Sequence, residues 1–165
     1  MMNKAVFIDR DGVINDDTGH YYIHKIQDFK INDGIVEGLK ILSNAGFKLI
    51  VITNQAGIAK GVYSHKDVEK VHQYLTSELK RKGINLTDIY YCPHHESVVL
   101  CDCRKPKPGM ILKAIEQHNI DPGKSFLIGD SVRDIEAGQS ARLGKCYKIE
   151  SNESILDICK EIAAI

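Results

Sequence analysis

The chain of 165 residues favours one domain, spanning residues 1–165, that is large enough to bury a hydrophobic core. Its 22 basic and 22 acidic side chains give a net charge of zero, so the composition provides no general attraction to nucleic acid or to an acidic membrane. The hydrophobic share of 43% and the charged share of 27% are typical of globular proteins and exclude disordered, coiled-coil and fibrous classes.

Apolar runs that stop at a polar residue predict buried strands at residues 4–8, 47–52 and 125–128, and two more strands are expected at 88–91 and 145–149. Ser64 and Asp67 form a capping-box pattern at the start of one predicted helix, and Gly46 and Gly83 stand where helices should end. The helices are predicted from apolar residues at three-to-four spacing, namely Ile35, Leu39 and Leu42; Val68, Val71, Leu75 and Leu79; Ile111, Leu112 and Ile115; and Ile155, Ile158 and Ile162. Strand and helix alternate five times, which predicts a three-layer, Rossmann-like α/β fold with a mostly parallel sheet and helices on both faces.

The lengths of the apolar runs and the spacing of the cysteines also indicate the cellular compartment. The longest have about four residues, far fewer than the roughly 20 that a transmembrane helix needs. Only the short run from Ala5 to Ile8 precedes Asp9, which is too short for the apolar region of a secretory signal peptide. Three of the five cysteines cluster within residues 92–103, which is typical of metal binding in a reducing compartment. We therefore expect a cytoplasmic monomer that binds neither membrane nor nucleic acid.

Polar side chains follow three of the predicted strands. Asp9, Thr53 and Asp130 stand at strand ends, and Asp11 and Asn54 lie beside them. Ligands of parallel α/β sheets bind beyond the carboxyl ends of the strands, so these groups should share one crevice. Clustered carboxylates are costly without a cation, and hard oxygen ligands suit Mg²⁺ together with phosphate oxygens. The pattern predicts metal-assisted phosphoryl transfer.

These residues carry a family resemblance that covers nearly the whole chain. Asp9-Arg10-Asp11-Gly12-Val13, a Thr after the second strand, a Lys after the third strand and Gly129-Asp130 resemble the four motifs of the haloacid dehalogenase superfamily. Within it, Thr53-Asn54-Gln55, Cys92-Pro93-His94-His95 and Cys101-Asp102-Cys103-Arg104-Lys105-Pro106 are similar to segments of the D-glycero-D-manno-heptose 1,7-bisphosphate phosphatases, and in part to those of histidinol phosphatases.

The resemblance implies a mechanism with a phospho-aspartate intermediate. Asp9 would attack the phosphorus, and Asp11 would protonate the leaving oxygen and then activate a water. Thr53 would hydrogen-bond the transferred phosphoryl group, and Lys105 would neutralise its charge, with Lys107 as the rival lysine. The Mg²⁺ ligands would be Asp9, Asp11 and Asp130. Asp134 is better explained as a helix cap or salt-bridge partner, and surface positions are expected for His65, His72 and His118.

A second metal site is predicted in the cysteine cluster. One imidazole and three thiolates complete a tetrahedral set for structural Zn²⁺, leaving no open position, and they come from Cys92, His94, Cys101 and Cys103. His95 is the alternative to His94. The zinc would pin a loop whose next residues, Arg104 and Lys105, must reach the phosphate.

The segments between the motifs are too short for a separate cap domain, so residues 15–24 and the zinc loop should shape the pocket. A small phosphorylated sugar fits such a site, and Arg suits bidentate phosphate binding. The candidates for substrate binding are Arg10, Asp17, Gly19, His20, Asn54, Gln55 and Arg104.

The leading hypothesis from the resemblance is a Mg²⁺-dependent phosphatase that removes the 7-phosphate of D-glycero-D-manno-heptose 1,7-bisphosphate. A histidinol-phosphate phosphatase is the alternative of the same class. A receiver-like module that accepts phosphate on Asp and holds it is a different class, and a zinc-stapled interaction protein is a third. The zinc loop and the acid two residues after Asp9 argue against the receiver, whereas the intact motifs argue against the interaction protein.

Overall fold

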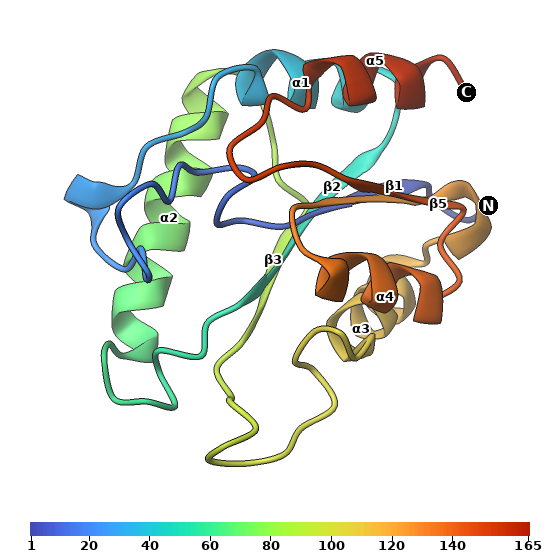
Figure 1. Cartoon of the computed structure of the whole chain (residues 1–165). Helices are drawn as coiled ribbons and strands as arrows, with labels where there is room; N and C mark the ends of the chain where they lie inside the picture. The colour runs from blue at the N-terminus through green and yellow to red at the C-terminus, as the bar shows by residue number, and fades with distance from the viewer.

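The computed structural model describes residues 1–165 and contains a five-stranded parallel sheet in the order β3-β2-β1-β4-β5 (Figure 1). The strands are β1 (Ala5–Ile8), β2 (Lys48–Asn54), β3 (Asp88–Cys92), β4 (Phe126–Gly129) and β5 (Lys145–Lys148). All five predicted strands are present, with small shifts at their ends. The topological switch point lies between β1 and β4, because β2 and β3 extend the sheet on one side of β1 and the chain then crosses to β4 and β5 on the other.

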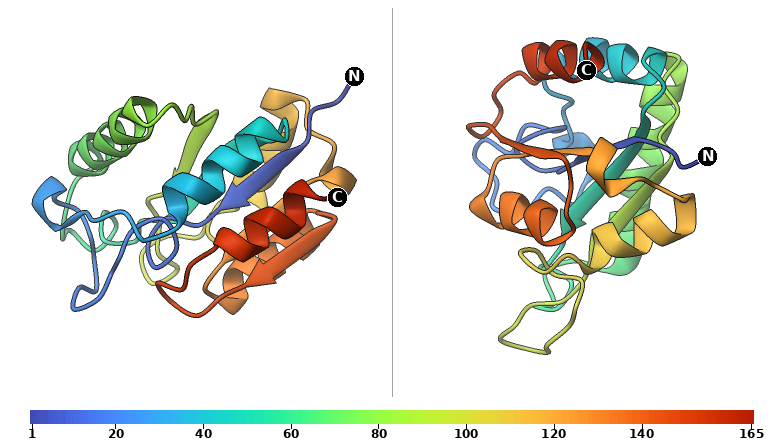
Figure 2. Two further views of the ribbon diagram at one scale, coloured as in Figure 1. Left: turned by 90° about the horizontal axis from the view of Figure 1, so that it is seen from above. Right: turned by 90° about the vertical axis from the view of Figure 1, so that its right-hand side faces the viewer.

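Helices cover both faces of this sheet, which confirms the predicted three-layer α/β fold (Figure 2). α1 (Ile35–Asn44), α2 (His65–Arg81) and α5 (Leu156–Ala163) pack on one face, and α1 and α5 run side by side. α3 (Gly109–His118) and α4 (Val132–Ser140) pack on the other, and two short 3-10 helices are η1 (Ile26–Asp28) and η2 (Pro122–Lys124). Alternate residues of β1 serve the two cores: Val6 and Ile8 face α1, whereas Ala5 and Phe7 face α3.

Local sequence signals explain several helix ends. The backbone N–H of Asp67 donates to the Ser64 hydroxyl at 3.2 Å, and the Asp67 carboxylate accepts from the Ser64 N–H at 2.9 Å, which is the predicted capping box of α2. Gly46 and Gly83 follow α1 and α2 with φ values of 85° and 81°, a conformation that glycine adopts without strain. Leu112, expected in the apolar stripe of α3, is instead 48% exposed.

The segments between the motifs are occupied by elements of the layered fold. α1 lies between Asp11 and β2, and α2 and β3 lie between Asn54 and Lys105. No large cap is present, as the sequence predicts. None of the helices combines the length and the apolar character that crossing a bilayer requires.

Candidate active site and metal sites

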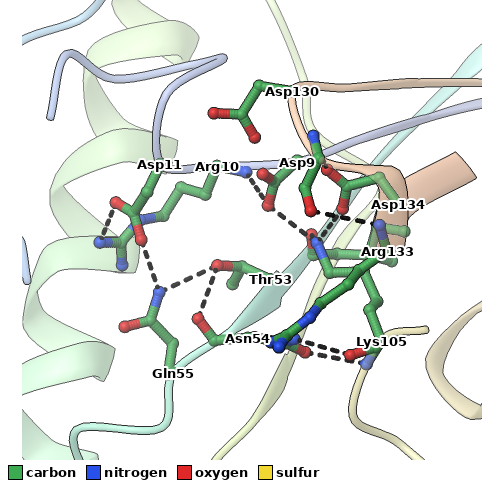
Figure 3. A network of polar contacts seen from close by, with 12 residues as sticks. Asp9, Arg10, Asp11, Thr53, Asn54, Gln55, Lys105, Asp130, Arg133 and Asp134 are labelled. Carbon is green, nitrogen blue, oxygen red and sulfur yellow. Dashed lines mark hydrogen bonds and ion pairs between the residues drawn. The ribbon is translucent and has the colours of Figure 1, made fainter. Parts of the chain in front are cut away.

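A buried ion-pair cluster lies at the carboxyl ends of β1 and β4 (Figure 3). The Lys105 ammonium donates to Asp9 Oδ1 at 2.9 Å, to Asp134 Oδ1 at 2.6 Å and to the Ile52 carbonyl at 3.1 Å. The Lys105 side chain is only 4% exposed. Its rival Lys107 is exposed and donates to the carbonyl of Cys101 instead, so the structure brings Lys105 to the predicted nucleophile.

This cluster contains more acidic than basic groups. Burial alone favours the neutral amine of Lys105, but the Asp9 and Asp134 carboxylates raise its pKa above the ordinary value. Burial and the Asp134 carboxylate raise the pKa of Asp9 well above its ordinary value, and Lys105 opposes this shift. Oxygens of Asp9, Asp130 and Asp134 lie within 4.8 Å of one another. The cluster thus holds three carboxylates, of which the one ammonium pairs with two, an arrangement that fits a divalent cation with oxygen ligands such as Mg²⁺.

The carboxylates of this cluster differ from the expected set of magnesium ligands. The structure brings Asp134, and not Asp11, to Asp9 and Asp130. Asp11 Oδ1 accepts from Arg10 Nη2 at 2.6 Å and from Arg10 Nε at 3.0 Å, away from the other carboxylates. Asp134 also has its predicted structural roles, because it pairs with Lys105 and its Oδ2 accepts from the backbone N–H of Ser131 at 3.1 Å. Asp134 joins the cluster through Lys105, which lies 29 positions earlier in the chain, so local sequence does not reveal its place there.

Two glycines allow the carboxylates to approach the backbone. Gly12 has φ +78°, and a Cβ there would lie 2.2 Å from Asp130 Oδ2. A Cβ on Gly129 would lie 2.4 Å from the side chain of Asp134. Side chains at these positions would displace the carboxylates, which is a physical reason for glycine in both motifs.

The residues at the end of β2 form two hydrogen-bonded links. Asn54 and the backbone of Lys105 bond reciprocally, with distances of 3.2 Å and 3.0 Å. Gln55 Nε2 donates to Asp11 Oδ2 at 3.1 Å and to the Thr53 hydroxyl at 2.9 Å. The Tyr63 hydroxyl donates to Gln55 Oε1 at 2.6 Å, so the amide nitrogen faces Asp11 and Thr53. Asn54 and Gln55 therefore position catalytic candidates as well as facing the cleft.

A cleft of about 250 Å³ opens over this cluster. The sequence-predicted residues that line it are Asp9, Asp11, Thr53, Asn54, Gln55, Arg104 and Lys105. Further lining residues, which the sequence did not single out as substrate-binding candidates, include Tyr21, Tyr22, Lys60, Tyr63 and Arg133. Tyr21 and Tyr22 lie in the 15–24 loop that was expected to shape the pocket, so their position could have indicated them. Lys60 stands in a glycine-containing turn after β2, whereas no sequence signal separates Arg133 from other surface arginines.

Four of the predicted substrate-binding residues do not line the cleft. Asp17, Gly19 and His20 lie outside it, and Asp17 Oδ1 accepts from Asn152 Nδ2 at 3.0 Å. The Arg10 side chain is completely buried. Arg104 does line the cleft, and its Nε lies 2.7 Å from Glu96, which is outside the lining. The side of the 15–24 loop that faces the cleft depends on packing partners far along the chain, such as Asn152 for Asp17.

His72 is also corrected, since it is 7% exposed and not a surface residue. Its Nε2 lies 3.2 Å from Arg10 Nη1, and its ring packs edge-on against Tyr91 with centroids 5.7 Å apart. Burial and the Arg10 charge lower the pKa of His72 to about 3, and Asp11 opposes this. The helical spacing of α2 did not reveal this, because Arg10 is 62 residues away.

Acid is expected to destabilise the fold through His72. Its pKa is about 3 in the folded protein and near 6.5 in the unfolded chain, so the unfolded chain binds the extra proton between these values. The contribution of His72 to stability is present above pH 6.5 and is lost as the pH falls toward 3. Between pH 7 and pH 5, the unfolding free energy of the wild type should fall by about 2 kcal/mol more than that of His72→Gln. Urea titrations at both pH values measure this difference, and equal losses in both proteins would contradict it.

The predicted zinc residues form a compact second cluster. Cys92 Sγ lies 3.0 Å from Cys103 Sγ and 3.7 Å from Cys101 Sγ, and His94 Nδ1 lies 3.3 Å from Cys103 Sγ. Sulfurs bound tetrahedrally to Zn²⁺ at about 2.3 Å would lie roughly 3.8 Å apart, so this set could hold the ion after small shifts. His95 bonds Ser97 and lines the cleft, so the structure favours His94 as the fourth ligand.

Comparison with known proteins identifies the family. The family model described as polynucleotide kinase 3 phosphatase matches residues 4–152. The chain is 42% identical to D-glycero-beta-D-manno-heptose-1,7-bisphosphate 7-phosphatase of Pasteurella multocida, over 98% of this chain and 90% of the relative. It is 41% identical to the alpha counterpart of Photorhabdus laumondii, over 90% and 83%.

A solved structure supports the fold. D,D-heptose 1,7-bisphosphate phosphatase from B. bronchiseptica, complexed with magnesium and phosphate, superposes with a TM-score of 0.84 at 23% identity, over 96% of this chain and 98% of that one. The sequence matches and the layered fold agree with the motifs found at the strand ends. The chain therefore belongs to the heptose-1,7-bisphosphate 7-phosphatase family of the haloacid dehalogenase superfamily.

Proposed function

We propose that this protein is a cytoplasmic phosphatase that removes the 7-phosphate of D-glycero-D-manno-heptose 1,7-bisphosphate. We also propose that residues 1–165 act as a monomer of one domain and that neither nucleic acid nor membrane is a ligand. The observation that carries the activity is the Asp9–Lys105–Asp134 cluster beneath a polar cleft at the switch point of the sheet. The choice of substrate rests on relatives that are about 40% identical to this chain and are named as heptose-1,7-bisphosphate 7-phosphatases.

The reaction proceeds in two displacements. A carboxylate oxygen of Asp9 attacks phosphorus, and the bond to the sugar oxygen breaks while the Asp11 carboxyl donates its proton to that oxygen. A water then attacks the phosphorus of the phospho-aspartate, gives its proton to Asp11 and restores the Asp9 carboxylate. Lys105 and Thr53 stabilise the charge of the transferred phosphoryl group. The net change is monoester plus water to alcohol plus inorganic phosphate.

Two metal ions complete the proposal. Mg²⁺ would be held by Asp9 and Asp130 with Asp134, and it would reduce the repulsion between the Asp9 carboxylate and the substrate phosphate. The fold neighbour from B. bronchiseptica was solved with magnesium and phosphate, which supports this choice. Zn²⁺ would be structural, because its four protein ligands leave no position for substrate.

Phosphate release with Mg²⁺ tests the proposed substrate. The panel holds the alpha and beta heptose bisphosphates, histidinol phosphate, a 3′-phosphorylated oligonucleotide and 4-nitrophenyl phosphate. The proposal expects the highest kcat/KM for one heptose anomer. A preference for histidinol phosphate or for the oligonucleotide would replace the substrate but keep the chemistry, whereas phosphorylation that persists without turnover would support a receiver-like module.

Cys101→Ser is expected to lose zinc. Removing even an outer partner of a metal ligand costs about 10- to 100-fold in affinity, so loss of a direct thiolate should cost at least as much. Metal analysis of the purified protein should find zinc in the wild type and in Cys146→Ser, whose thiol lies on β5 outside the cluster. Unchanged zinc content in Cys101→Ser would refute the assignment. Activity of that variant should fall because Arg104 and Lys105 follow the loop.

A further inference from the structure

His72 is a buried ionisable residue that the proposed reaction does not use. It lies on α2, is 7% exposed, and places Nε2 3.2 Å from Arg10 Nη1. Arginine has donors and no acceptors, so His72 must accept this hydrogen bond. The ring is therefore neutral, with its hydrogen on Nδ1 and the Nε2 lone pair directed at the guanidinium.

The guanidinium of Arg10 is held on several sides. Nη2 donates to the Ile23 carbonyl at 2.5 Å, and the Phe29 ring lies 5.7 Å from the guanidinium carbon. Nε and Nη2 both donate to Asp11 Oδ1, at 3.0 Å and 2.6 Å. The side chain is 0% exposed, so it contributes no contact to a ligand in the cleft. Its polar contacts join α2 and the 15–24 loop to Asp11. Figure 3 shows the guanidinium beside the Asp11 carboxylate.

The two carboxylate oxygens of Asp11 have different hydrogen-bond donors. Oδ1 accepts from Arg10 twice and from Asn15 Nδ2 at 3.0 Å. Oδ2 accepts only from Gln55 Nε2, at 3.1 Å. The Asp11 side chain is 30% exposed and lines the cleft. Because Oδ1 is occupied by donors, Oδ2 is the oxygen that can carry the proton exchanged with the leaving group and with water.

We propose that His72 is a positioning residue for the acid–base step: it holds Arg10 so that Arg10 occupies Asp11 Oδ1 and leaves Oδ2 to exchange the proton. The proposal rests on the proposed phosphatase function. Without the His72 acceptor, the guanidinium can rotate away from Oδ1, and the Asp11 carboxyl loses its orientation toward the sugar oxygen. Loss of His72 should therefore impair protonation of the leaving group and not phosphate binding.

Two phosphate esters with different leaving groups distinguish a positioning role of His72 from a merely structural one. A sugar alkoxide needs a proton as it departs, whereas 4-nitrophenolate departs without one. The parameter kcat/KM contains only the steps through departure of the leaving group, so it reports the acid role of Asp11. His72→Leu should lower kcat/KM for the sugar phosphate by about tenfold or more, and for 4-nitrophenyl phosphate by less than about threefold. His72→Gln, whose amide oxygen can accept from Arg10, should recover most of the loss.

Val71→Ala is the matched control, because Val71 is a buried neighbour on α2 with an apolar side chain. It should lower thermal stability and leave the ratio of the two kcat/KM values unchanged. Equal losses for both esters in His72→Leu, the same ratio change in Val71→Ala, or no recovery in His72→Gln would each overturn the proposal. A wild type that prefers another alkyl phosphate would refute only the heptose substrate, and the ratio would then be measured with that ester. Absence of turnover of any ester by the wild type would overturn both proposals.

Discussion

Asp9→Asn is expected to abolish phosphate release, with kcat/KM lowered by at least about 10³-fold. The variant loses the carboxylate oxygen that attacks phosphorus, and an amide cannot replace it. The fold should survive, because asparagine has nearly the same volume and its carbonyl oxygen can still accept from the Lys105 ammonium, which also keeps Asp134. Phosphate release with Mg²⁺ and thermal unfolding, measured on the same preparation, check the two parts of this expectation.

Asp33→Asn provides the matched control. Asp33 is an exposed carboxylate that does not line the cleft, so its replacement should leave kcat/KM unchanged. Turnover by Asp9→Asn at a tenth of the wild-type rate would contradict a phospho-aspartate intermediate on this residue. A similar loss in Asp33→Asn would show that the effect is not specific to the cluster.

Lys105→Met is expected to impair both activity and stability. The substitution leaves Asp9 and Asp134 buried without their ammonium partner, which typically costs about 3–5 kcal/mol. It also removes a positive charge that stabilises the transferred phosphoryl group, so kcat/KM should fall by about 10²-fold or more. Urea unfolding in a chelator should reveal the full loss of stability, and added Mg²⁺ should restore part of it by supplying positive charge to the same carboxylates.

Lys107→Met distinguishes the two neighbouring lysines. Lys107 is exposed and donates to the Cys101 carbonyl, so its loss should affect kcat/KM by less than about threefold if Lys105 is the phosphate-binding lysine. A larger loss in Lys107→Met than in Lys105→Met would reverse the assignment. Failure of Mg²⁺ to stabilise Lys105→Met would argue against a cation site at Asp9, Asp130 and Asp134.

Local sequence patterns were sufficient to predict the strands and helices of the fold. The apolar run before Asp9 predicts β1 because a strand buried on both faces must be apolar throughout. The Ser64 and Asp67 pair predicts the start of α2, since a capping box needs only residues three positions apart. The Leu112 position shows the limit of this reasoning: a spacing indicates a stripe, but packing of the whole helix decides which residues join it.

The location of a site residue was predictable where the residue directly follows a strand. Asp9 and Asp130 follow adjacent strands, and strand order alone brings such residues to one edge of a parallel sheet. Lys105 was identified through its motif resemblance, because a long loop has no periodicity that indicates where its side chains lie. For the same reason the sequence did not reveal that Asp17, Gly19 and His20 lie outside the lining of the cleft. The zinc residues were identified from the close spacing of cysteines and a histidine, whose ligand chemistry is a local property.

By itself, the sequence determined the α/β class, the strand ends and the chemistry of the motif residues, because periodicity, caps and ligand types are local properties of the chain. Only the tertiary structure decided that Asp134 joins the carboxylate cluster, that Arg10 is buried beneath the site and that His72 holds it. Asp134 pairs with Lys105, which is 29 positions away, and Arg10 and His72 are 62 positions apart. Burial of a charged side chain depends on whether such distant partners arrive to neutralise or hydrogen-bond it, and local sequence does not encode that.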